Sequence, residues 1–369
     1  MKKKVILLTA MVATMVALVG CGGSNNGAGS KDKKGGYEVA LITDSGNIDD
    51  GSFNEGTWDG IKDYCEKNNI THGYYIPTAE SSQAQKDAIN NAIQKGAKVI
   101  VTPGFSFAST INDLQNDSKY DKIQFLLIDT VPADEAGNAT EIKKNVHCIN
   151  YMEEQAGYLA GYAAGKDGFT KLGFLGGQSI PAVARYGYGY VQGANAAAVE
   201  LNIANKVEMN YWYGGTFSPS DDVYSKMDGW YSKGTEVVFA CGGKIWQSAT
   251  KAAESASKNV IGVDVDQAND SNTIITSALK GIKNSVSLAM ADLYGNGGVW
   301  PDALAGQTQT LGAADDCVGL PTEEASWRFK KFTVEEYNTL FAKVKSGEIV
   351  ISNDVNTKPN VQITVNYEQ

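Results

Sequence analysis

A short stretch of the sequence, ITDSGNIDDGSFNEGTWDG (Ile42–Gly60), concentrates carboxylates around one aromatic ring. Asp44, Asp49, Asp50 and Glu55 surround Phe53. Side chains of these types can hold a metal ion, line a phosphate site, act as an acid–base pair or clamp a hydroxylated ring system. The rest of the sequence discriminates among these four kinds of site.

The spacing disfavours a calcium loop of the EF-hand type. DSGNIDDGSFNE begins with Asp44 and ends with Glu55, but its third and fifth positions, Gly46 and Ile48, carry no ligand. A phosphate site is disfavoured because no glycine-rich phosphate motif follows the first apolar run. The motif CGGKIW (241–246) could hold an anion or a carbonyl oxygen at a helix start, which is a weak signal. We therefore expect no metal ion and no cofactor.

The sequence offers little for hydrolysis or group transfer. It contains two histidines, His72 and His147, no GxSxG nucleophile motif and no cysteine with an evident base beside it. Paired carboxylates can catalyse without histidine, so a hydrolase that uses Asp44 with Asp49 or Asp50 stays open as an alternative. We expect a protein that binds its ligand and does not transform it.

A site for a polyhydroxylated ligand suits these residues best. A carboxylate accepts hydrogen bonds from the vicinal hydroxyls of a ribose or hexose, and an aromatic ring covers the flat face of a sugar or base. Asp44 and Phe53 supply this pair, and we interpret Asp49 and Asp50 as acids of the loop or helix start. The ring candidates from the second half are Tyr186, Phe239 and Trp246, of which Phe239 could instead pack into a core.

Apolar strands alternate with helical patterns along the chain and must position these side chains. EVALIT (38–43), KVIVTPG (98–104), QFLLIDT (124–130), KLGFLGG (171–177) and TEVVFACGG (235–243) are continuous apolar runs, typical of parallel sheets covered on both faces. Helical periodicity follows each of the first runs, as in FNEGTWDGIKDYCEKN (53–68). The sequence predicts an α/β protein, with two parallel sheets.

The residues that follow the predicted strands are rich in glycine, acids and aromatic rings. In open parallel sheets, ligands bind at the carboxyl ends of the strands, so we expect six strand ends to form one composite site between two domains. These ends are 44–53, 102–107, 129–132, 176–181, 240–246 and 264–267.

The start of the chain has the pattern of a bacterial lipoprotein signal. Lys2 to Lys4 precede a short apolar run that ends on LVGC, which predicts a signal peptide over residues 1–20 and lipidation of Cys21. Residues 21–36 are predicted to form a flexible tether.

The net charge of −10 disfavours nucleic acid as a partner. Whether any two of the other cysteines form a disulfide stays open; they are Cys65, Cys148, Cys241 and Cys317.

Several motifs occur together in an order that resembles the basic membrane protein family, the lipoprotein substrate-binding proteins of the purine nucleoside receptor A type. They are TDSGNIDDGSFNEGTWDG, LLIDT, GFLGG, VFACGG, GVDVDQ and ITSALK. The resemblance covers residues 37–300 and implies a type I periplasmic-binding-protein fold, with two Rossmann-like lobes joined by a hinge. We place the first lobe at 37–150 plus about 272–315, and the second at 151–271 plus about 316–369.

The resemblance also implies a ligand, a partner and site residues. The ligand would be a nucleoside, of the purine class, and the partners would be the permease subunits of an ABC importer, with the lipid anchor holding the protein on the outer face of the cell membrane. Asp44 would bind the ribose, Phe53 would stack on the base, and Phe239 or Trp246 would cover its other face. The further contacts would be Ser45, Asn54, Asp129, Gly243, Asp264 and Lys280.

Two departures from the family pattern leave the base preference open, namely CGGKIW (241–246) and YGYGY (186–190). The alternatives are a sugar or a flavin-type ligand, a sensor on the same fold, and a nucleoside-hydrolysing enzyme.

Overall fold

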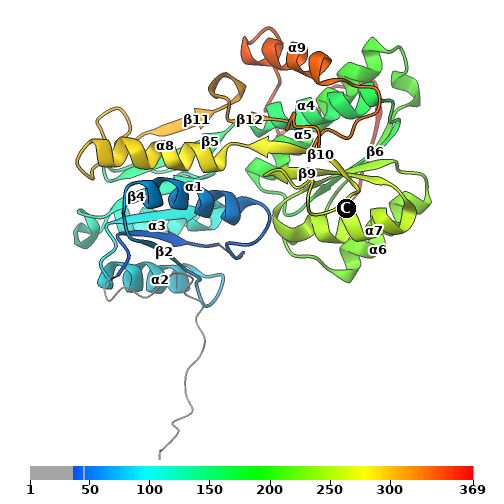
Figure 1. The fold of residues 1–369 in the computed structure, drawn as a ribbon. Helices are drawn as coiled ribbons and strands as arrows, with labels where there is room; N and C mark the ends of the chain where they lie inside the picture. Colours follow the sequence, from blue (N-terminus) through cyan, green and yellow to red (C-terminus); the bar gives the residue numbers. More distant parts are fainter. Residues whose placement is uncertain (1–35, 45, 369) are drawn as a thin grey trace, which may run out of the picture.

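The computed structural model describes residues 36–44 and 46–368 as two lobes that lie side by side (Figure 1). The predicted signal peptide, Cys21, almost all of the tether and Ser45 lie outside these residues. Within them, no helix is both long enough and apolar enough to cross a membrane.

The first lobe is built on a six-stranded parallel sheet of order β11-β5-β4-β3-β1-β2. Its strands are β1 (Val39–Ile42), β2 (His72–Tyr75), β3 (Val99–Pro103), β4 (Gln124–Ile128), β5 (Val146–Tyr151) and β11 (Thr308–Leu311). All residues of β1, β3 and β4 are buried, as continuous apolar runs predict. One face packs on α1 (Phe53–Lys67) and α8 (Ile282–Gly295), and the other on α2 (Ser82–Gln94) and α3 (Ala108–Gln115).

The second lobe repeats this plan with a seven-stranded sheet of order β12-β10-β9-β8-β6-β7-β13. Its strands are β6 (Lys171–Gly176), β7 (Glu208–Tyr213), β8 (Val237–Cys241), β9 (Asn259–Asp264), β10 (Ile274–Lys280), β12 (Val318–Gly319) and β13 (Thr364–Tyr367). All its pairs are parallel except β10 with β12. The helices are α4 (Glu153–Asp167), α5 (Pro181–Glu200), α6 (Asp221–Ser232), α7 (Trp246–Ala256) and α9 (Val334–Lys345).

The chain crosses between the lobes three times: from β5 to α4, from β10 to α8, and from β11 to β12. The second crossing corrects one predicted boundary. We expected residues 272–315 in the first lobe, but β10 pairs with β9 and β12 in the second sheet. The crossing therefore falls at Gly281, directly before α8 packs onto α1.

Two helices of the second lobe, α4 and α5, approach each other unusually closely. A Cβ atom added to Gly161 would overlap the carbonyl oxygen of Tyr190, and one added to Gly193 would overlap that of Tyr158. Only glycine allows this separation, so the small-residue pattern of both helices sets how closely α4 and α5 pack.

The four cysteines of the described residues are buried free thiols, Cys65, Cys148, Cys241 and Cys317. No cluster of potential metal ligands occurs among the residues described.

Candidate ligand-binding cleft

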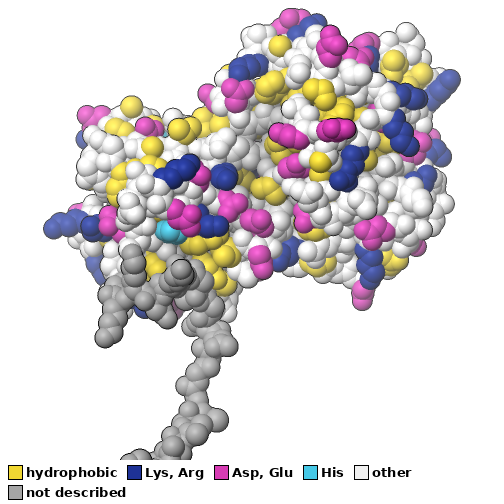
Figure 2. Space-filling view, in the orientation of Figure 1, with side chains coloured by type: hydrophobic (Ala, Val, Ile, Leu, Met, Phe, Trp, Pro, Cys, Tyr) yellow, Lys and Arg dark blue, Asp and Glu magenta, His cyan; other side chains and the backbone are white. Residues whose placement is uncertain are grey.

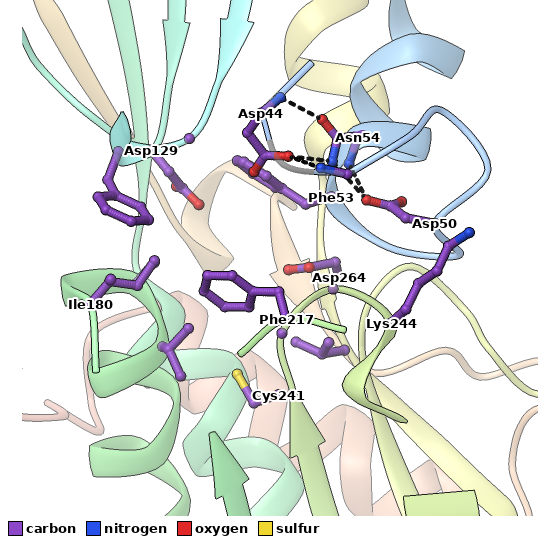
Figure 3. A pocket seen from close by; sticks show the side chains of 18 of the residues that line it. Asp44, Asp50, Phe53, Asn54, Asp129, Ile180, Phe217, Cys241, Lys244 and Asp264 are labelled. Atoms are coloured by element: carbon purple, nitrogen blue, oxygen red, sulfur yellow. Dashed lines mark hydrogen bonds between the residues drawn. The ribbon is translucent and has the colours of Figure 1, made fainter. Parts of the chain in front are cut away.

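A cavity of about 400 Å³ lies between the lobes, at the carboxyl ends of the strands (Figure 3). All six predicted strand ends contribute to its lining. The first lobe supplies the segments around Asp44, Gly104 and Asp129. The second lobe supplies Ile180 to Val183, Cys241 to Lys244, and Asp264.

Equivalent positions of the two sheets present equivalent groups to the cleft. Asp129 follows β4 and Asp264 ends β9, and β4 and β9 occupy the same place in the two strand orders. Both aspartates have left-handed backbones, with φ of 61° and 65°. Non-glycine residues rarely adopt this conformation, and it carries strain. Both carboxyl groups lie in the lining of the cleft.

Asp44 lies at the end of the first strand, β1, and only one of its oxygens is engaged by the described residues. Its Oδ1 accepts the N–H of Gly46 at 2.8 Å and the side-chain amide of Asn54 at 2.8 Å. Burial raises the pKa of Asp44 to about 6; those two hydrogen bonds oppose the rise, and the nearby Asp50 and Glu80 carboxylates add to it. Oδ2 is left as an acceptor for a ligand.

Lys280, at the end of β10, sits at the centre of a buried charge cluster. It pairs with Asp129, with Glu153 Oε1 at 3.1 Å and with Asp264 Oδ1 at 3.8 Å. Arg185 Nε donates to the other oxygen of Glu153 at 2.6 Å. Burial alone would lower the pKa of Lys280, but the three carboxylates raise it above its usual value.

Asp129 is the carboxylate of this cluster that both lines the cavity and has an open acceptor. Burial raises its pKa to about 7, although Lys280 acts in the opposite direction. Its Oδ1 is buried and has no hydrogen-bond partner within the residues described. Because a buried unpaired acceptor is costly, this atom is well placed to receive a donor from a ligand.

Asp264 is engaged by both lobes. Its Oδ2 accepts the Ser52 hydroxyl of the first lobe at 2.6 Å, and its Oδ1 accepts the Tyr186 hydroxyl at 3.3 Å. Two further contacts cross the cleft next to it. Gln267 Nε2 donates to the carbonyl of Gly51 at 2.6 Å, and Lys244 Nζ lies 3.2 Å from Asp49 Oδ1.

Two aromatic side chains lie on opposite sides of the cleft (Figure 3). Phe53 comes from the start of α1, and Phe217 comes from the loop after β7 in the other lobe. Phe105 lines the cavity nearer to solvent and is 41% exposed. The rings therefore leave a slot between the lobes into which a flat group can enter.

Of the three ring candidates from the second half, Tyr186 lines the cavity, whereas Phe239 and Trp246 do not. Phe239 is fully buried among Phe174, Tyr186 and Tyr190 and does not line the cavity. Its side chain points to the α4–α5 face of the sheet because alternate residues of β8 face opposite sides. Trp246 is buried against α6 and approaches Gly51, also outside the cavity lining.

Phe217 was missed because the end of β7 was not among the strand ends we considered. The run KVEMNYWY (206–213) predicts this strand, and YGGTFSPS (213–220) follows it with the glycine and aromatic content of the other ends.

Of the predicted contacts, Ser45 lies outside the described residues. Those that line the cavity are Asp44, Phe53, Asn54, Asp129, Gly243, Asp264 and Lys280.

Two three-layer lobes with a cleft and three crossings define the type I periplasmic-binding class, and solved structures agree. A solute-binding protein of an ABC transporter system from Aeropyrum pernix K1 superposes with a TM-score of 0.70 at 21% identity, over 87% of this chain and 93% of that one. A dimeric Lac repressor superposes with a TM-score of 0.52 at 11% identity, over 79% of this chain and 99% of that one. These likenesses establish the fold.

The chain belongs to the PnrA-like family of ABC transporter substrate-binding proteins, whose family model matches residues 37–354. It is 29% identical over 303 residues to the ABC transporter nucleoside-binding protein BmpA of Lactococcus lactis, covering 76% of this chain and 82% of the relative. It is also 29% identical to basic membrane protein B of Borreliella burgdorferi, covering 89% and 90% of the two chains. The protein is thus a solute-binding component of an ABC transporter.

Proposed function

We propose that the protein binds a purine nucleoside in the cleft and presents it, in the closed state, to the permease subunits of an ABC importer. One observation carries the proposal. Acceptor oxygens that lack protein partners among the described residues, on Asp44 and Asp129, lie in the same cavity as two rings, Phe53 and Phe217, from opposite lobes. This combination suits a molecule that joins hydroxyl donors to a flat heterocycle.

The charges of the cleft favour a ligand without a phosphate. Four acidic side chains line it, namely Asp44, Asp50, Asp129 and Asp264. Two lysines also line the cavity. Lys280 already contacts three carboxylates and Lys244 pairs with Asp49, so both offer little attraction to an added anion. A neutral nucleoside avoids the repulsion that a nucleotide meets. The cavity volume of about 400 Å³ falls within the range of small-molecule sites.

Closure follows from contacts that a ligand makes with both lobes. Phe53 and Asp44 belong to the first lobe, whereas Phe217 and Gly243 belong to the second. A ligand that touches all four binds the closed state more tightly than the open one and shifts the equilibrium towards it. The contacts from Asp49, Gly51 and Ser52 to the second lobe add to closure.

The relative from Lactococcus lactis supports this ligand class, because it is described as nucleoside-binding. We further propose that Cys21 carries the lipid that holds the protein at the outer face of the cell membrane. The face of the molecule in Figure 2 carries Lys and Arg side chains interspersed with Asp and Glu, with no broad basic area on it for nucleic acid.

Native mass spectrometry of the purified protein tests the ligand. A bound mass equal to a purine nucleoside supports the proposal, whereas a hexose or a flavin would replace it by one of the alternatives. Incubation with inosine followed by chromatography tests for hydrolysis. We expect the nucleoside to be recovered intact, and release of free base would show an enzyme.

A further inference from the structure

Asp50, which we predicted as an acid at the helix start, is buried there and accepts four hydrogen bonds. Its Oδ1 accepts the backbone N–H of Ser52 at 2.9 Å and of Glu55 at 3.1 Å. Its Oδ2 accepts the backbone N–H of Asn54 at 3.0 Å and the side-chain amide of Asn54 at 2.9 Å. The three backbone contacts satisfy the first turn of α1. The fourth is not needed for capping.

The fourth contact orients the side chain of Asn54. The Nδ2 group of Asn54 donates to Asp50 Oδ2 and, at 2.8 Å, to Asp44 Oδ1, while its Oδ1 faces the backbone N–H of Asp44 at 3.4 Å. A side-chain amide has two donor hydrogens, and both point at carboxylates here. Reversal of the amide would set an oxygen against two anionic oxygens, so Asp50 opposes it.

Asn54 thereby acts on Asp44 rather than on the ligand. With its two donor hydrogens engaged by Asp44 and Asp50, it holds Asp44 Oδ1 and leaves Oδ2 for the cleft. We propose that Asp50 is a positioning residue for ligand binding, which fixes the Asn54 amide so that Asp44 is held as an oriented, ionised acceptor. This inference rests on the proposed function.

The charges around Asp44 make the proposal testable by the direction in which the pKa of Asp44 changes. Asp50 from the start of α1 and Glu80 from the loop after β2 are like charges that raise the pKa of Asp44, whereas the Asn54 hydrogen bond lowers it by more than Asp50 raises it. Lys280, from the end of β10, contacts other carboxylates. Removal of the Asp50 charge alone would therefore lower the pKa of Asp44, and release of Asn54 would raise it.

The experiment is a carbon-13 NMR titration of the Asp44 carboxyl in ligand-free wild type and in Asp50→Asn. We expect its pKa to rise above about 6 in the variant. Asp50→Ser keeps one capping oxygen, serves as the second variant if Asp50→Asn does not fold, and should show the same rise. In an Asn54→Ala background the same substitutions should lower the pKa of Asp44, because only the charge of Asp50 is left to remove.

Calorimetry with inosine provides the second measurement. We expect Asp50→Asn to weaken binding by about tenfold or more near neutral pH, and to shift the acidic limit of binding upward. The control is Asp59→Asn, which removes an acid of α1 that pairs only with Lys62 among the described residues. It should change neither the affinity for inosine nor the pKa of Asp44. A lower or unchanged pKa of Asp44 in the Asp50 variants would show that Asp50 is only a helix cap. If neither inosine nor any other purine nucleoside binds wild type, the proposed function is wrong, but the NMR titration still decides the role of Asp50.

Discussion

Replacement of Lys280 by methionine tests the buried charge cluster of the cleft. The substitution keeps an unbranched apolar chain but removes the cation that pairs with Asp129, Glu153 and Asp264. Glu153 keeps Arg185 as a partner, whereas Asp129 loses the only hydrogen-bond donor that the described residues offer it. Each close pair contributes about 4 kcal/mol at an effective dielectric of about 20, before the cost of burial is subtracted.

The loss of a buried cation leaves uncompensated carboxylates, which costs about 3–5 kcal/mol of unfolding free energy. The cost depends on pH. Without Lys280, the folded-state pKa values of Asp129 and Asp264 rise further, so the two groups take up protons on acidification and the penalty disappears. For Asp129, the destabilisation is therefore greatest above the folded-state pKa that this group has in the variant, which lies above the wild-type value of about 7, and it shrinks as the pH falls from there to about 7.

Urea unfolding of both proteins at about pH 8 and about pH 5.5 measures this difference. Lys283→Met, an exposed position on α8, is the matched control and should stay within about 0.5 kcal/mol of wild type. A loss below about 1 kcal/mol for Lys280→Met, or a loss of the same size at both pH values, would refute the reasoning.

Three further predictions concern the aromatic rings, Asp44 and the packing of α4 on α5. Phe217→Ala should weaken nucleoside binding by about 1–3 kcal/mol in calorimetry, whereas Phe239→Leu should chiefly lower stability. If Phe239→Leu weakened binding and Phe217→Ala did not, Phe239 and not Phe217 would contact the ligand. Affinity should fall as the pH drops through about 6, because a protonated Asp44 accepts hydrogen bonds poorly; constant affinity between about pH 5 and pH 8 would exclude Asp44 as the acceptor. Gly161→Ala should destabilise the protein by about 1–3 kcal/mol in urea unfolding, despite the helix preference of alanine, since its Cβ would overlap the Tyr190 carbonyl; unchanged stability would contradict the close packing of α4 and α5.

The sequence was sufficient to predict the fold because strand and helix signals agree along most of the chain. Continuous apolar runs gave buried parallel strands, and the rule that ligands bind at strand ends brought Asp44, Asp129 and Asp264 together. Ser81 precedes α2 and accepts the N–H of Ala84, and Gly96 follows α2 with φ of 108°. These features depend on local residues, which a single sequence displays.

Features set by tertiary contacts were harder to predict. The direction in which Phe239 points depends on the register of β8. A shift of that register by one residue would move every side chain of the strand to the opposite face of the sheet. The place of β10 depends on its pairing with β9, although the helix after it belongs to the other lobe. The role of Asn54 depends on which carboxylates its amide meets, and this follows only from the folded loop.

Calorimetric titration of the protein with purine and pyrimidine nucleosides, their 5′-phosphates and free ribose tests the central claim most directly. We expect a purine nucleoside to bind with micromolar or tighter affinity, and its 5′-phosphate and free ribose to bind much more weakly, because the former meets the acidic cleft and the latter lacks a ring for Phe53 and Phe217. Tight binding of the 5′-phosphate or of ribose, or no binding of any nucleoside, would contradict the account.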